Sequence, residues 1–146
     1  MATATITGNE LKTTIINFLK KKDTGALATS GIETRVSPVK YFLGEGLEIY
    51  IHSNGGSKFL NLEKNKEVCL LVSTEFYGDY ETIKGVQIFG QAEVGQEGSN
   101  LYKQAEEYCP FEHMGNEDGY IIKINAQKAV YKDAVDGDGE KSIWKA

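Results

Sequence analysis

Apolar and polar residues alternate along most of the chain, and this pattern predicts a mainly β protein that begins with a helix. The first helix is indicated over residues 9–22, where apolar side chains recur at helical spacing after the capping-box sequence Thr7-Gly8-Asn9-Glu10. A short helix is predicted from Ser57, and a third over residues 99–108, where Cys109-Pro110 ends it.

Strand patterns fill the segments between these helices. They cover residues 25–30, 32–40, 47–52, 68–72, 82–94, 120–124 and 129–132. Most of these strands follow one another without a long helix between them, which favours an antiparallel sheet or barrel over a doubly wound parallel sheet. Pro38 has no N–H to donate, so its strand is expected to lie at an edge or to carry a bulge. Gly85 and Gly90 are candidate bend or bulge points within 82–94.

Composition narrows the class of protein. The length of 146 residues predicts a single domain over residues 1–146, with tails at 1–8 and 134–146 as candidate flexible segments. The net charge of −5 argues against general nucleic-acid binding. No apolar run approaches the roughly 20 residues of a membrane helix, and the first twenty residues lack a signal-peptide pattern. Cys69 and Cys109 form no CxxC pair, so we expect a reduced, cytoplasmic protein with no metal site.

The basic run Lys20-Lys21-Lys22 has two interpretations. It is either a nucleic-acid patch or the end of the first helix, and the second is favoured because cations there complement the helix dipole.

The candidate chemistry centres on the sequence Ser53-Asn54-Gly55-Gly56-Ser57-Lys58. Hydroxyls, glycines, a lysine and the start of a helix are the groups that a phosphate needs, because helix N-terminal amides donate to anions and glycines allow close approach. The alternative is an ordinary strand-to-helix loop with Ser57 as the N-cap. The GKS/T ending of a Walker loop is absent.

Two cations on the preceding strand, Arg35 and Lys40, add to a possible anion site. Their positions differ in parity, so on a regular strand they face opposite ways. Either a bulge near Pro38 realigns them, or they contact different parts of a ligand, or Lys40 is simply solvated.

Three other candidates are weaker. His52 and His113 lack the spacing of metal ligands, and structural roles are favoured for both. The acidic tail at residues 136–140 lacks the spacing of an EF-hand calcium loop. The aromatic residues of 76–80 either stack on a flat ligand or cover the end of the barrel.

At this point the pattern resembles a known family. The order Arg-x-x-x-x-Lys, an aliphatic and aromatic strand, a small hydroxyl, Asn-x-Gly-Ser with a basic residue, and then Asn-Leu is similar to the pyridoxamine 5′-phosphate oxidase-like flavoproteins. The resemblance covers roughly residues 10–132. It implies a split β-barrel of about six antiparallel strands with flanking helices, and a homodimer with FMN at the interface.

The resemblance also implies roles for particular residues. Arg35, Ser57 and Lys58 correspond to the groups that hold the FMN phosphate. Lys40 corresponds to a lysine nearer the flavin ring, and His52 and Ser53 to the pair that borders the flavin. Val36, next to Arg35, is included among the cofactor contacts.

The chain departs from the oxidase at three places. Phe59 replaces a second basic residue after Ser57, which removes one phosphate cation. Gly85 replaces a glutamine that contacts the flavin, and Gln87 on the same face is the candidate substitute. The C-terminal segment that binds the pyridoxine substrate is not matched, and Trp144 alone does not restore it.

The sequence therefore predicts an FMN-dependent oxidoreductase of unknown substrate, with a small-molecule electron donor and acceptor. No catalytic side chain is assigned, because in such enzymes the cofactor carries the chemistry. The alternatives are a non-enzymatic flavin or haem module for binding or electron transfer, and an enzyme that uses a deazaflavin.

Overall fold

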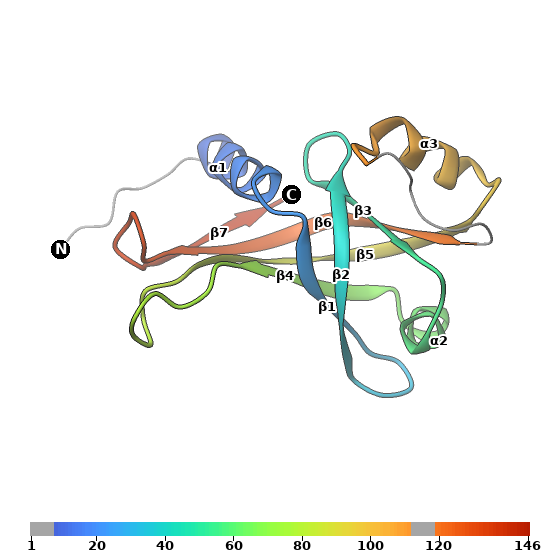
Figure 1. Ribbon diagram of the computed structural model, residues 1–146, viewed down its shortest axis with the longest axis horizontal. Helices are drawn as coiled ribbons and strands as arrows, with labels where there is room; N and C mark the ends of the chain where they lie inside the picture. Colours follow the sequence, from blue (N-terminus) through green and yellow to red (C-terminus); the bar gives the residue numbers. More distant parts are fainter. Residues whose placement is uncertain (1–7, 112–118) are drawn as a thin grey trace.

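The computed structural model of the chain describes residues 8–111 and 119–146, and Figure 1 shows its arrangement. Three helices and seven strands make up this part of the chain. In order they are α1 (Gly8–Lys20), β1 (Thr24–Thr29), β2 (Arg35–Leu43), β3 (Glu48–Ser53), α2 (Ser57–Lys64), β4 (Glu67–Ser73), β5 (Lys84–Gln96), α3 (Asn100–Tyr108), β6 (Tyr120–Asp133) and β7 (Lys141–Lys145).

The first six strands form a closed antiparallel barrel. Their order is β3-β2-β1-β4-β5-β6, and β3 pairs back onto β6 to close the ring. The first half of β6 pairs with β3, while its second half, from Lys128 to Lys132, pairs with β7. The predicted mainly β fold, a six-stranded antiparallel barrel with flanking helices, is confirmed.

Two predictions for the C-terminal part of the chain need correction, one of a pair of strands and one of a flexible tail. The strands expected at 120–124 and 129–132 are one continuous strand, β6, with a register shift opposite Phe89 and Gly90. Gly90 is thus an irregular point, as expected, and a Cβ there would lie 2.3 Å from the carbonyl oxygen of Asn125. Residues 141–145, assigned to a candidate flexible tail, form β7. A segment of five residues is too short for its own sequence pattern to predict a strand. It is the pairing with β6 that stabilises β7.

The core has two parts. The larger cluster fills the barrel and includes the apolar face of α1, from Leu11 to Leu19, as the helical spacing predicted. A smaller cluster lies outside the barrel, where Tyr102 and Ala105 of α3 cover Phe42, Tyr50 and Ile121. Figure 1 shows α1 beside β7 and α3 near the β2–β3 end of the barrel. No helix among the described residues is long and apolar enough to cross a membrane.

Ile51 provides a test of barrel closure, because it is fully buried and its strand pairs with β2 on one side and β6 on the other. We expect Ile51→Ala to lower the free energy of unfolding by about 2–5 kcal/mol, the usual cost of such a cavity. Ile32→Ala is the matched control, since Ile32 is 63% exposed, and it should stay within about 0.5 kcal/mol of wild type in urea denaturation. Equal effects would contradict the assignment of Ile51 to the core.

Candidate cofactor-binding site

The loop between β3 and α2 has the backbone shape of an anion cradle. Gly55 and Gly56 have φ values of 130° and 114°, which side-chain-bearing residues rarely adopt. Gly56 occupies the N-cap of α2, and no side chain caps the helix. The alternative in which Ser57 is the N-cap is therefore wrong, since Ser57 is the first helical residue. In the first turn of α2 the Phe59 N–H already donates to the Gly56 carbonyl over 3.2 Å. The N–H groups of Ser57 and Lys58 have no partner within the helix, so they are the donors available to an anion.

Ser53 and Lys58 hold the loop in this shape. The Ser53 hydroxyl lies 3.2 Å from the Gly55 carbonyl and 3.4 Å from the Gly55 N–H. The Lys58 ammonium donates to the same carbonyl over 3.2 Å. Burial lowers the pKa of Lys58 from its ordinary value. The lysine is thus a partly desolvated cation that lies over the glycine loop and donates to a carbonyl oxygen.

Asn61 of α2 ties a second segment to this loop. Its side chain is 1% exposed. The amide oxygen accepts from the N–H groups of Ile32 and Glu33 at 2.9 and 3.3 Å. The amide nitrogen donates to the Thr29 hydroxyl at 3.0 Å and to the Glu33 carbonyl at 2.7 Å. One buried side chain therefore fixes the β1–β2 loop against the helix that follows the cradle.

Arg35 begins β2 directly after this loop. It is the only arginine in the sequence. Its guanidinium forms an ion pair with Glu33, and its side chain is 46% exposed. Since Asn61 bonds to Glu33, the same side chain that docks the loop on α2 also sets where Arg35 enters the sheet.

Lys40 faces away from Arg35. The β1–β2 register runs without a break from Thr24–Lys40 to Thr29–Arg35, so β2 has no bulge at Pro38. The expected edge is present instead, because β3 pairs only with Tyr41 to Leu43 and leaves the first half of β2 unpaired on that side. Lys40 lies 3.8 Å from an Asp23 carboxylate oxygen and 4.2 Å from the Phe111 ring centroid. Val36 shares the outer face with Lys40 and is 66% exposed.

His52 lies at the end of β3 and contacts α3. Its Nε2 is 3.1 Å from the Tyr102 hydroxyl. Burial lowers the pKa of His52 below the ordinary histidine value of 6.5, although Glu97 opposes this shift. The imidazole is therefore neutral at pH 7. No local sequence signal indicates Tyr102 as its partner, because the two residues are 50 positions apart.

Gln87 is the one proposed cofactor residue that the chain does not bring near the cradle. It lies exposed on the outer face of β5, opposite Leu71 of β4. Both β1 and β4 separate β5 from β2 in the sheet. Its contact with the flavin was expected at an interface between two chains, so it stays a prediction.

The weaker sequence candidates receive no support from the described residues. Asp136 lies 3.6 Å from the Lys84 ammonium, and Asp138 accepts from the Glu140 N–H. Across residues 8–111 and 119–146 no group of three acidic, histidine or cysteine side chains is placed to hold a metal ion. Phe76 and Tyr80 are exposed, at 57% and 97%. His113 lies outside the described residues.

Comparison with known proteins identifies the family. The family model described as pyridoxamine 5′-phosphate oxidase matches residues 11–133. The chain belongs to this family. The match spans the cradle, Arg35 and Asn61, and it confirms the resemblance seen in the sequence. A search of curated protein sequences found no match.

Solved structures agree with the family's fold. The haem-binding protein from Mycobacterium smegmatis has a TM-score of 0.72 at 18% identity, over 97% of this chain and 59% of that protein. ChuZ from Campylobacter jejuni has a TM-score of 0.72 at 14% identity, over 97% of this chain and 61% of that one. General stress protein 26 from Bacillus anthracis has a TM-score of 0.63 at 18% identity, over 90% of this chain and 97% of that protein. The chain therefore spans about three fifths of the first two proteins and nearly all of the third.

Asn61 supplies the prediction for this site. Asn61→Ala leaves the Thr29 hydroxyl and the Glu33 backbone without their partner, and each such group costs about 1–3 kcal/mol when buried. We expect urea denaturation to show a loss of roughly 2–4 kcal/mol, and hydrogen exchange to be faster at the Ile32 and Glu33 amides. Asn65→Ala, which removes a bond to Ser30 and one to the Glu67 N–H, is the control and should cost about 1 kcal/mol or less. Unchanged exchange at Ile32 and Glu33 would contradict the role of Asn61.

Proposed function

We propose that the chain binds FMN and works as an oxidoreductase in a homodimer. The observation that carries the proposal is the cradle itself: uncapped helical N–H groups, two glycines in the left-handed region, and a partly desolvated lysine above them. Bound FMN would supply hydride and electron transfer. Membership of the pyridoxamine 5′-phosphate oxidase family supports this assignment.

The phosphate is assigned to Arg35, Ser57 and Lys58. The Ser57 hydroxyl and the first-turn amides donate to phosphate oxygens, and the Lys58 ammonium supplies charge. Arg35 has five N–H donors in a planar fork, so it can hold a phosphate while it keeps its bond to Glu33. Phe59 follows Lys58, so this cradle has one cation fewer than that of the oxidase.

The rest of the cofactor is assigned to the unpaired edge of β2. Val36 and Lys40 lie on that half of the strand, while His52 and Ser53 lie at the end of β3 where the two strands separate. Neutral His52 borders the flavin without adding charge, and Lys40 is the cation at the ring end. Lys40 and Arg35 face opposite ways, so they serve different parts of the same ligand.

A second copy of the chain is proposed on the outer face of the sheet. Cross-strand pairs place Val36, Ala28, Cys69 and Phe89 in one row, and Ala26, Leu71, Gln87, Val130 and Ile143 in the next. Val36, Leu71 and Ile143 are 66%, 43% and 58% exposed. An apolar face of this kind on one chain is typical of an interface. A partner on this face also gives Gln87 a role, because it would reach the cofactor site of the other subunit.

The alternative is a non-enzymatic module that binds flavin or haem, in line with the similar haem-binding protein from M. smegmatis. Haem needs an axial ligand such as histidine. His52, the histidine among the described residues, already has its Nε2 within 3.1 Å of Tyr102, which favours FMN. Oxidation of a reduced nicotinamide by the purified holoprotein would separate an enzyme from a carrier.

The FMN assignment is tested by spectroscopy and titration. Purified protein should show flavin absorption bands, and its melting temperature should rise when FMN is added. Arg35→Ala should weaken FMN binding by about tenfold or more, the effect of losing one bidentate charged contact. Lys103→Ala, which removes an exposed cation of α3, should leave the affinity unchanged. A colourless protein with no FMN-dependent thermal shift would refute the proposal, and a Soret band would favour haem.

The dimer is tested separately on its proposed face. Leu71→Lys places a charge at the centre of the apolar rows, so we expect the mass in solution, measured by light scattering, to fall from two chains to one. Val135→Lys introduces the same charge at a position of similar exposure, 38%, in the turn after β6. This control should leave the mass unchanged. A wild-type mass of one chain would refute the homodimer.

A further inference from the structure

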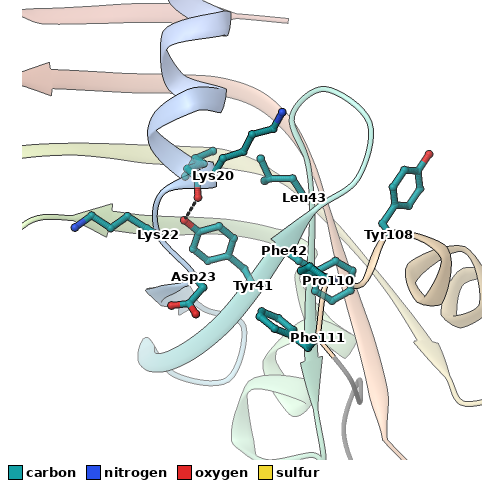
Figure 2. A pocket seen from close by; sticks show the side chains of 10 residues that line it. Lys20, Lys22, Asp23, Tyr41, Phe42, Leu43, Tyr108, Pro110 and Phe111 are labelled. Carbon is teal, nitrogen blue, oxygen red and sulfur yellow. Dashed lines mark hydrogen bonds between the residues drawn. The ribbon is translucent and has the colours of Figure 1, made fainter.

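A hollow of about 330 Å³ lies where the end of α1, strand β2 and the segment after α3 meet (Figure 2). This volume is within the range of small-molecule sites. None of its lining residues is among the cofactor contacts proposed above. The residues that line the hollow therefore have no role in the proposed FMN function.

The walls of the hollow are flat and fixed. The Tyr41 hydroxyl donates to the Leu19 carbonyl over 2.8 Å. Burial is the main cause of the raised pKa of Tyr41, so its hydroxyl stays protonated and keeps this bond. Phe42 packs between two rings, stacked on Tyr50 at 5.5 Å and edge-on to Phe111 at 6.2 Å. The hollow is thus lined mainly by fixed aromatic and apolar side chains, which favour a planar apolar ligand over a flexible one.

The charges around the hollow are mostly positive, in a chain whose net charge is −5. Lys20 and Lys22 line it, and Lys40 lies over the ring of Phe111, another lining residue. The acidic lining residue, Asp23, is 3.8 Å from the Lys40 ammonium. Three lysines and one carboxylate leave a local charge of +2. In Figure 2 the Lys20 side chain extends past Leu43 at the edge of the hollow.

The end of α1 does not oppose an anion here. A helix C-terminus is normally negative because its last carbonyls lack partners. In this chain the Phe18 carbonyl accepts from the Lys21 N–H, and the Leu19 carbonyl accepts from the Lys22 N–H and from Tyr41. The Phe18 and Leu19 carbonyls are therefore satisfied, which weakens their opposition to an anion beside the lysines.

We infer that this hollow binds a small planar aromatic carboxylate, with its ring against Leu43, Pro110 and Phe111 and its carboxylate at Lys20. This inference does not depend on the flavin. Lys40 contacts Phe111 and is also a proposed cofactor residue, so the two ligands would be neighbours if FMN binds as proposed.

The test uses two probes of nearly equal shape, 2-naphthoate and its uncharged analogue 2-naphthamide. Calorimetric titration of the full chain, without added FMN, should show naphthoate binding about tenfold more tightly or better, the effect of one charge-assisted hydrogen bond. Lys20→Ala should remove this preference. Lys21→Ala removes the same charge one residue further on, from an exposed side chain that does not line the hollow, and should keep the preference.

A third variant tests the location. Leu43→Trp fills the hollow and should abolish naphthoate binding while far-UV circular dichroism stays unchanged. Equal binding of the two probes, equal effects of Lys20→Ala and Lys21→Ala, or wild-type affinity in folded Leu43→Trp would each overturn the inference. If Leu43→Trp does not fold, the comparison of Lys20→Ala with Lys21→Ala tests the inference without it. Failure of FMN binding alone would leave the inference standing, because no flavin is present in these titrations.

Discussion

The candidate site depends on one buried amide. Asn61 makes four hydrogen bonds to residues 28 to 32 positions earlier in the sequence, and they join α2 to the β1–β2 loop. The helix start holds the glycine cradle, and the loop leads into Arg35. Without this side chain, the two halves of the proposed phosphate site would belong to separate surface loops, each free to move. The hydrogen bonds of a buried polar side chain compensate for the cost of removing it from water when all its polar groups are bonded, as they are in Asn61.

Barrel closure and site formation are linked through β3. This strand pairs with β2 over only three residues and with β6 over six. It therefore diverges from the start of β2 while it closes the ring on its other side. The proposed cofactor is assigned along the part of β2 that β3 leaves unpaired, so the short β2–β3 pairing is common to the barrel and to the proposed site.

Local sequence signals predicted much of this arrangement. Helical spacing identified α1, and the glycines at 55 and 56 marked the start of α2. Strand parity predicted that Arg35 and Lys40 face opposite ways, and Pro38 marked an edge. Each of these signals acts within a few residues.

Most of the features that the sequence missed are long-range. The Asn61 contacts and the His52–Tyr102 contact join residues 28 to 50 positions apart, and β7 exists only by pairing with β6. The position of Gln87 relative to Arg35 is long-range in the same way, because its face on β5 does not indicate that β4 and β1 lie between β5 and β2. In the sequence, Asn61 is a polar residue next to Leu62 on the buried side of a short helix. This position indicates that the amide is buried, but it does not indicate which residues it bonds to.

The proline in β2 has a consequence for how the molecule avoids unwanted association. The Tyr41 N–H bonds to the Asp23 carbonyl, and bonded pairs alternate along an antiparallel ladder, so the nitrogen of Pro38 points away from β1 and toward the open edge. A free strand edge is a template on which another strand can add, and this one lacks a donor at its centre and has a cation at each end. Aggregation through strand addition is thereby disfavoured, and the edge stays open to a small molecule.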